Sequence, residues 1–345
     1  MAQAIDALRH GWPLQMIGGP VLLPVETAIS ARAEGAQMLI SSARAATLKL
    51  INQREAAAPH APVLIHGAER FTLTSARPIG DPALDLASPL KGPFRAETIG
   101  WPDEAEAALE LARLAGILPA FLVDPEHAGE AQPVAASDLA QWKDPAKLAI
   151  ATRAHLPIAA CENAEIVAFR SVDDTREHVA LVIGTQTSDR APLVRLHSEC
   201  LTGDILGSLK CDCGPQLDAA LSAMVQEARG GGWGVLLYMR QEGRGIGLVN
   251  KMRAYRLQDQ GFDTVEANQR LGLPDESRDF STAARMLELL GVRDIRLMTN
   301  NLRKVVALED AGVRVTQRVQ HQLPANPHNA RYLDTKRDRS GHLLD

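Results

Sequence analysis

Aromatic residues and cysteines are scarce in this chain: aromatics make up 4% of its 345 residues, and there are four cysteines. Few aromatic side chains predict a core built mainly from aliphatic residues. With so few cysteines and no sign of an oxidising compartment, a disulfide framework is not expected. No run of about 20 apolar residues occurs, so we expect no membrane-spanning helix. The first residues also lack a long apolar run, which predicts no signal peptide.

The chain also has nearly equal numbers of basic and acidic residues. The formal net charge is −5, from 37 basic and 42 acidic residues, which argues against broad nucleic-acid binding. What is present is the balance of a globular protein, with 46% hydrophobic and 23% charged residues. The length predicts two domains or one large one. A cytoplasmic enzyme, with neither nucleic acid nor membrane as a partner, is the default interpretation.

Three of the four cysteines lie in one stretch, RLHSECLTGDILGSLKCDCGPQ at 195–216. These are Cys200, Cys211 and Cys213, whereas Cys161 lies well upstream. Thiolates bind zinc strongly, and three protein ligands leave a fourth position for water, as in a catalytic zinc site. Such an ion lowers the pKa of its water to about 7. The alternative, ordinary buried cysteines, is disfavoured by the polar neighbours.

The apolar patterns predict alternating strands and helices, and therefore a mixed α/β (α+β) fold. A polar stretch at 124–145 with three prolines predicts a domain boundary, giving domains 1–142 and 143–345. The tail from Pro324 is polar and predicts partly ordered surface. The expected helices are 5–10, 103–116, 215–229, 249–258, 279–291 and 305–312, and the expected strands are 20–25, 118–123, 166–169, 178–183, 193–196, 233–239 and 295–298.

Two loops that follow expected strands are candidate phosphate sites. QEGRGIGL at 241–248 combines three glycines with Arg240 and Arg244, and TNNLRK at 299–304 places cations at a helix start. Ligands of α/β proteins bind outside the carboxyl ends of strands, where arginine and helix N-termini hold phosphate. Each loop alone is also compatible with an ordinary turn. Together with the cysteine stretch, they suggest zinc-dependent hydrolysis of a phosphorylated substrate.

These motifs resemble GTP cyclohydrolase II, a family of riboflavin biosynthesis. The similarity covers roughly residues 145–345 and rests on RLHSECLTGDILGSLKCDCGPQL, LLYMRQEGRGIGLVNKMRAYRLQDQGFDTVEAN, RDF, LMTNNLRK and YLDTKRDRSGHLL. It implies that GTP is hydrolysed to formate, pyrophosphate and 2,5-diamino-6-ribosylamino-4(3H)-pyrimidinone 5′-phosphate. It also implies a homodimer, one zinc per subunit on Cys200, Cys211 and Cys213, and magnesium with the GTP phosphates. A GTP-binding regulator without turnover, or a related ring-opening enzyme of pyrimidine catabolism, is the alternative.

The resemblance also implies roles for individual residues. Tyr255 would lie near the reacting ring, Arg278 would act at the α-phosphate, and Glu276 or Asp275 would accept a proton. Because arginine stays protonated, charge stabilisation is a safer role for Arg278 than nucleophilic attack. Glu276, Lys210 and Leu302 depart from the residues common in the family, but no zinc ligand is lost. The implied substrate-binding residues are Arg195, Leu196, His197, Ser198, Glu199, Gln216, Glu242, Gly243, Arg244, Thr264, Thr299 and Lys304.

The first half has a second resemblance. AIDALRHGWP and EAALELARLAG are similar to parts of 3,4-dihydroxy-2-butanone 4-phosphate synthase. That family needs an acid-rich magnesium loop, but the corresponding stretch 16–27 has only Glu26, and a metal-binding histidine is replaced by Glu104. The resemblance therefore predicts a degenerate, non-catalytic domain that serves as a scaffold or a dimer surface.

Overall fold

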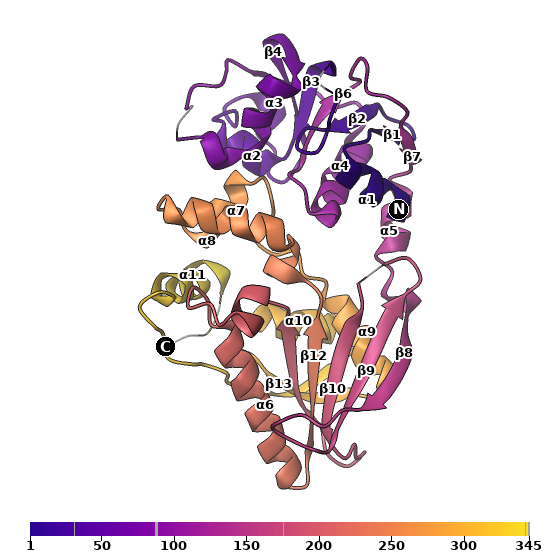
Figure 1. Ribbon diagram of the computed structural model, residues 1–345, viewed down its shortest axis with the longest axis vertical. Helices are drawn as coiled ribbons and strands as arrows, with labels where there is room; N and C mark the ends of the chain where they lie inside the picture. Colours follow the sequence, from indigo (N-terminus) through magenta and orange to yellow (C-terminus); the bar gives the residue numbers. More distant parts are fainter. Residues whose placement is uncertain (31, 87–88, 175, 342, 344–345) are drawn as a thin grey trace. The chain divides into compact units, whose positions relative to one another are not determined.

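A computed structural model describes residues 1–30, 32–86, 89–174, 176–341 and 343. The chain folds into two compact units, one comprising Met1–Lys143 with Ile246–Ser277 and the other Asp144–Gly245 with Arg278–Asp345. Each unit contains a seven-stranded sheet with helices packed on it (Figure 1), which confirms the predicted mixed α/β class. Residues 246–277, which lie inside the predicted domain 143–345, group with the N-terminal unit.

The first unit has the strand order β5-β4-β3-β6-β2-β1-β7, in which all pairs are antiparallel except β1 with β7. Its strands are β1 (Leu14–Met16), β2 (Val21–Pro24), β3 (Glu34–Ile40), β4 (Val63–Thr72), β5 (Arg95–Glu97), β6 (Ala120–Val123) and β7 (Gln132–Val134). Its helices are α1 (Ala2–His10), α2 (Ser42–Thr47), α3 (Leu73–Gly80), α4 (Pro102–Ala115), α5 (Ser137–Trp142), α7 (Leu248–Asp259) and α8 (Thr264–Arg270).

Alternation along the strands places apolar side chains on both faces of this sheet. Leu39 packs with α1 and α4 on one face, whereas Met38 packs with α2 and α3 on the other. Helix α4 forms as the sequence predicts, with acids in its first turn and Gly116 ending it at a φ of 76°. A separate apolar cluster joins Leu118 to α7 and α8.

The second unit has the strand order β14-β13-β11-β12-β10-β9-β8. Strands β14, β13, β11 and β12 pair in parallel, and β10, β9 and β8 complete the sheet with antiparallel pairs. Its strands are β8 (Leu148–His155), β9 (Ala164–Ser171), β10 (His178–Gly184), β11 (Leu193–Ser198), β12 (Trp233–Met239), β13 (Asp294–Met298) and β14 (Arg314–Val319). Its helices are α6 (Cys213–Arg229), α9 (Phe280–Leu289), α10 (Leu302–Asp310) and α11 (Ala330–Ser340).

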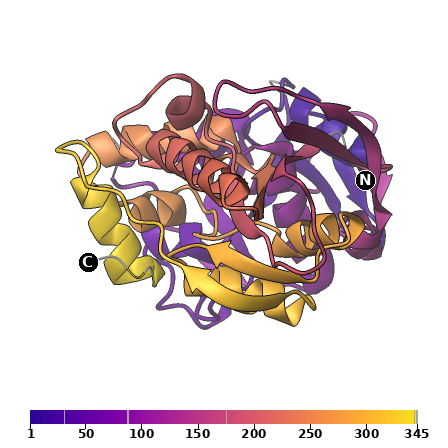
Figure 2. The same cartoon turned by 90° about the horizontal axis from the view of Figure 1, so that it is seen from below.

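Helices cover both faces of this second sheet (Figures 1 and 2). Leu193 packs with α6 on one face, and its neighbour Val194 packs with α9 and α10 on the other. The carboxyl ends of β11, β12 and β13 meet at one edge because these strands are parallel. α/β proteins of this architecture bind ligands at this edge, so we expect the functional site there.

The polar tail is more ordered than its composition suggests. It forms α11, and it buries Asn329 and Lys336, which are 2% and 9% exposed. The expectation of partly ordered surface is therefore wrong for these two residues. Both are buried because they have polar partners in the second unit, the carbonyl of Cys211 for Asn329 and the carboxylate of Asp212 for Lys336.

Candidate metal centre and substrate site

Cys200, Cys211 and Cys213 come together at the carboxyl end of β11. Cys200 follows that strand, and the other two lie where α6 begins. Their three sulfurs lie within 4.8 Å of one another, and the Sγ atoms of Cys200 and Cys211 are 3.7 Å apart. Tetrahedral bonds of about 2.3 Å to one zinc ion would separate sulfurs by about 3.8 Å. The spacing of Cys200 and Cys211 therefore matches that of a shared zinc ion.

The surroundings of the sulfurs also fit a metal. A Cβ atom added to Gly203 would lie 2.8 Å from Cys211 Sγ and 3.0 Å from Cys200 Sγ, so only glycine leaves the sulfurs this room. The neighbouring thiols of Cys200 and Cys211, together with burial, raise the pKa of Cys213 well above its ordinary value. Three thiolates this close repel one another, and a divalent cation removes that repulsion. The donor set is thus suited to zinc.

A buried carboxylate, Asp204, holds the start of the cysteine loop. It accepts hydrogen bonds from the Tyr238 hydroxyl at 2.9 Å and from the Cys200 main-chain N–H at 3.0 Å. Nε2 of His197 lies 3.1 Å from both of its oxygens, and the His197 ring stacks on Tyr238. Burial first, and then Asp204, raise the pKa of Tyr238, so its hydroxyl stays a donor. Residues of both β11 and β12 therefore hold Asp204, and through it they fix the position of Cys200.

The loop after β12 also contacts the cysteine loop. Glu242 accepts the Leu201 main-chain N–H at 2.8 Å and the Gly243 N–H at 2.9 Å. Gly243 and Arg244 have φ values of 64° and 60°, a left-handed conformation that is uncommon for arginine. Such backbone concentrates at ligand sites. Glu199, next to Cys200, forms an ion pair with Arg240 at 2.5 Å.

A chain of hydrogen bonds fixes Gln216 beside the sulfurs. Its side-chain oxygen accepts from Arg195, and its Nε2 donates to Asp212 at 2.6 Å. Arg195 also donates to the Met298 carbonyl at 3.0 Å, which ties β11 to β13. Burial lowers the pKa of Arg195 to about 10, so the guanidinium stays charged at neutral pH. Its Nε is buried and has no partner among the described atoms.

Two further predicted site residues, Lys304 and Arg278, lie near the same aromatic ring. Lys304 Nζ and the Arg278 guanidinium carbon lie 6.0 and 5.4 Å from the centre of the Phe280 ring. Lys304 is 6% exposed and donates to the Leu196 carbonyl at 2.9 Å. Thr299, at the end of β13, accepts the Asn301 main-chain N–H at 3.1 Å. The parallel strands thus bring cations to the same edge as the sulfurs.

Three predicted residues, Tyr255, Thr264 and Glu276, belong to the first unit. Tyr255 lies on α7, with Lys251 Nζ 5.8 Å from its ring centre. Thr264 begins α8 and accepts a hydrogen bond from Gln258 at 3.0 Å. Glu276 lies, like Asp275, in the half-buried segment after α8. Their proposed roles in the reaction stay predictions.

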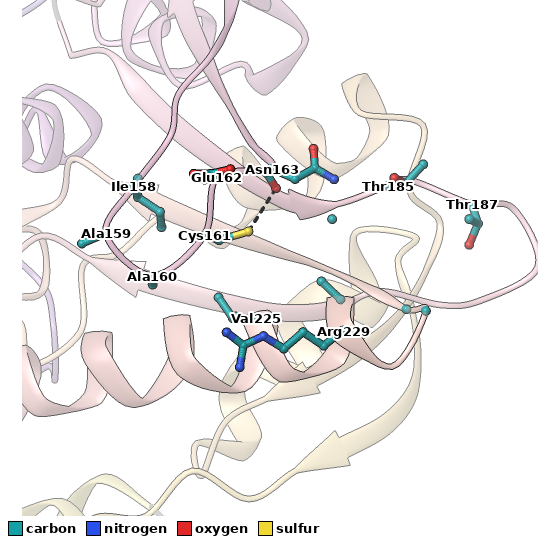
Figure 3. Close-up of a pocket in the computed structure, with 14 residues that line it drawn as sticks. Ile158, Ala159, Ala160, Cys161, Glu162, Asn163, Thr185, Thr187, Val225 and Arg229 are labelled. Carbon is teal, nitrogen blue, oxygen red and sulfur yellow. Dashed lines mark hydrogen bonds between the residues drawn. The ribbon is translucent and has the colours of Figure 1, made fainter.

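A cavity of about 570 Å³ lies apart from this edge (Figure 3). Val225 and Arg229 line it from the end of α6, whereas Cys213 begins that helix, about 18 Å from Val225 and about 24 Å from Arg229 along its axis. Inside it, Cys161 donates to the Asn163 carbonyl at 3.4 Å. It contains none of the predicted site residues, so the convergence of side chains, not cavity size, identifies the site.

Sequence reasoning did not assign a role to several residues that build this edge. The side chains of Asp204, Asp212, Tyr238 and Lys336 contact the cysteine loop or its neighbours. The signal that pointed to two of them was the density of acids around the cysteines. Tyr238 and Lys336 lie within motifs that carry the family resemblance, but no local pattern indicated their contacts.

The second unit is thus an α/β fold whose ligand-binding edge carries several cations and three cysteines that could hold a metal ion. Residues 149–320 match the family described as GTP cyclohydrolase II. The chain is 44% identical over 281 residues to a GTP cyclohydrolase-2 from Azospirillum brasilense, covering 78% of this chain and 70% of that protein. The chain belongs to the GTP cyclohydrolase II family of hydrolases.

Two further relatives show how far the likeness extends. A GTP cyclohydrolase-2 from Azotobacter vinelandii is 62% identical over 170 residues, 49% of this chain and 79% of that protein. The riboflavin biosynthesis protein RibBA from Nocardia farcinica is 46% identical over 264 residues, 70% of this chain and 63% of that protein. This last match covers more of the chain than residues 143–345 contain, so it extends into the N-terminal half. No helix in the described ranges is long and apolar enough to cross a membrane.

Proposed function

We propose that this chain hydrolyses GTP with the help of one zinc ion per subunit. The guanine C8 leaves as formate after water cleaves both of its C–N bonds. Water also cleaves the bond between the α- and β-phosphates, which releases pyrophosphate. The remaining product is 2,5-diamino-6-ribosylamino-4(3H)-pyrimidinone 5′-phosphate. The single observation that supports this best is the group of three cysteine sulfurs beside Arg195 and Gln216 at the carboxyl end of β11.

Cys200, Cys211 and Cys213 would hold the zinc ion, which supplies Lewis acidity and so activates water near neutral pH. Gln216 presents a fixed amide to the base, since Arg195 and Asp212 determine which end carries the donor. One acceptor lone pair and one N–H of that amide remain for guanine.

Cations of the second unit bind the triphosphate together with magnesium. Arg278 stabilises negative charge at the α-phosphate, and Lys304 adds a second cation near the same aromatic ring. Arg244 and the N–H groups of the glycine loop bind phosphate oxygens. Tyr255 lies near the reacting ring, Glu276 accepts a proton, and Thr264 and Thr299 complete the substrate contacts. The enzyme acts as a cytoplasmic homodimer.

The N-terminal half is proposed to have no synthase activity. Glu26 is the only acid in the stretch where a synthase needs magnesium ligands, and its carboxylate accepts the Leu118 main-chain N–H at 2.7 Å. It also forms an ion pair with Arg253. Incubation with ribulose 5-phosphate and magnesium should give no dihydroxybutanone phosphate; robust formation would refute the proposal.

The decisive test of the GTP reaction combines formate release with elemental analysis. The natural chain should release formate and pyrophosphate from GTP and contain one zinc per subunit. Cys211→Ala should lose both, because two thiolates hold zinc much less tightly. Cys161→Ala, which changes the one cysteine outside the cluster, should retain both. GTP binding without formate would favour a regulator, and turnover by Cys211→Ala without zinc would exclude the proposed chemistry.

A further inference from the structure

Glu26 attaches helix α7 to the N-terminal half of the chain. Its Oε1 lies 2.7 Å from Nη2 of Arg253, and its Oε2 lies 3.0 Å from Nη1, so the pair is bidentate. Both side chains are mostly buried, at 20% and 24% exposed. Charge-assisted pairs of this fork geometry are among the stronger polar contacts of proteins. The same carboxylate also accepts the Leu118 N–H, which makes Glu26 a junction between three segments.

The face of α7 that carries Arg253 is docked along its length. Asn250, with 0% exposure, donates to the Gly116 carbonyl at 3.3 Å and accepts from Arg253 at 2.8 Å. Ala254 and Leu257 continue this face at helical spacing. They belong to a buried apolar cluster that consists of Leu118, Ile246, Ala254, Leu257, Ala267, Leu271 and Leu273.

The end of α8 is docked on the N-terminal half as well. Gly272 has a φ of 75°, and an added Cβ would lie 2.7 Å from Ser41 Oγ and 3.2 Å from Pro119 Cγ. The buried Arg44 donates to the Arg270 carbonyl at 3.4 Å. The segment 246–277 is therefore held at its beginning by Glu26 and at its end by the region around Arg44.

This docking determines which way Tyr255 faces. Tyr255 comes two residues after Arg253, which is about 200° around an α-helix. It therefore lies on the side of α7 turned away from the docked face, together with Lys251. A rotation of α7 of one residue would carry its phenol about 100° around the helix axis. The orientation of the side chain proposed to meet the reacting ring thus depends on the anchor of the helix.

We propose that Glu26 is a positioning residue for the GTP reaction, and that the N-terminal half serves to hold α7 and α8. The one acid in the stretch 16–27 has structural contacts in this chain, to Arg253 and to the Leu118 N–H. This inference rests on the proposed function, because it assumes that Tyr255 takes part in turnover. It predicts that a change in the N-terminal half slows chemistry without disturbing the zinc site.

The test compares Glu26→Gln with the natural chain in three measurements: kcat for GTP, zinc content and amide hydrogen exchange of residues 248–259. We expect kcat to fall roughly tenfold, as for loss of a mostly buried charged hydrogen bond, with KM changed less than kcat. Zinc content should stay at one per subunit. Exchange of α7 should become faster, since its anchor is gone. Arg253→Lys, which keeps the charge but loses the fork, should give a smaller fall.

The double variant Glu26→Gln with Arg253→Gln separates positioning from general damage. Arg253→Gln alone completes the cycle. If both residues act through one pair, the double variant should be no slower than the slower of Glu26→Gln and Arg253→Gln. Glu126→Gln is the matched control, because Glu126 forms an exposed pair with Arg70 at 2.9 Å in the same unit. It should leave kcat, zinc and exchange unchanged.

Several outcomes would overturn the inference. One is a kcat for Glu26→Gln within twofold of the natural value. Another is a fall in kcat without faster exchange of α7, since the effect would then not pass through that helix. A third is a double variant whose fall in kcat is the product of the falls in the two single variants, since the two residues would then act independently. If the natural chain does not turn over GTP, the proposed function fails, and the exchange data alone decide whether Glu26 anchors α7.

Discussion

The ammonium group of Lys336 donates a hydrogen bond to Oδ1 of Asp212 over 2.7 Å, and Asp212 stands between two of the proposed zinc ligands. Both side chains are buried, at 11% and 9% exposed. Burial alone would raise the pKa of Asp212, but Lys336 keeps it below the ordinary value. Helix α11 is thereby joined to the turn that carries Cys211 and Cys213.

Lys336→Met should destabilise the second unit by about 3 kcal/mol, because removing one partner leaves the other charge buried without compensation. Urea unfolding at neutral pH measures this. Lys147→Met is the control: Lys147 pairs with Asp173 in the same unit, but both side chains are about one-third exposed. That change should cost less than about 1 kcal/mol. Equal losses of unfolding free energy in the two variants would show that burial of the Lys336 pair does not increase its contribution to stability.

Gly203→Ala should weaken zinc binding. The added methyl would lie within 3.0 Å of two sulfurs, so the cysteine loop must shift before a metal can be shared. Changes just outside metal ligands lower affinity by roughly 10- to 100-fold, and we expect a loss of that size in competition with a chelator. Gly230→Ala, whose added Cβ would meet the carbonyl oxygens of Glu227 and Gln226 at 3.4 and 3.6 Å, should bind zinc normally. Unchanged affinity in Gly203→Ala would contradict the proposed geometry.

The parts of this structure that were predictable from sequence are those with a local cause. Strand β12 is a run of apolar residues in a buried strand, and its bounds match the predicted 233–239. Cys211 and Cys213 are two residues apart, so their proximity needs no knowledge of the fold. Edge strands were missed for the opposite reason: β8 buries only Leu148 fully, so it has no alternating pattern to recognise.

The supporting residues of the site were not predictable because their partners are distant in the chain. Tyr238 reaches Asp204 across 34 residues, and Lys336 reaches Asp212 across 124. Lys336 lies within the motif YLDTKRDRSGHLL, but the polar composition of that motif does not show that this lysine is buried. Likewise, the bidentate pair of Glu26 with Arg253 spans 227 residues and becomes visible only once the chain is folded.

Acid should destabilise the second unit partly through His178. This imidazole is 5% exposed, and its Nδ1 accepts the Arg240 main-chain N–H at 3.1 Å, which requires the unprotonated nitrogen. Burial, and then Arg176, lower its pKa from 6.5 to about 4. The other charged groups near it are Asp174, Asp279 and the Arg240 guanidinium. Between these two pH values the unfolded chain binds a proton that the folded chain does not, so stability falls as the pH drops.

The total loss expected from His178 is about 3 kcal/mol between pH 6.5 and 4, with no further contribution below. Unfolding free energies of the natural chain and of His178→Asn, measured at several pH values, isolate it. Asparagine keeps an acceptor for the Arg240 N–H but does not titrate. Burial lowers the pKa of His321 to about 4 as well, but His321 is present in both proteins and cancels in the difference. If both proteins lose the same stability in acid, His178 does not take up a proton on unfolding. The inference that it is buried as a neutral acceptor would then be wrong.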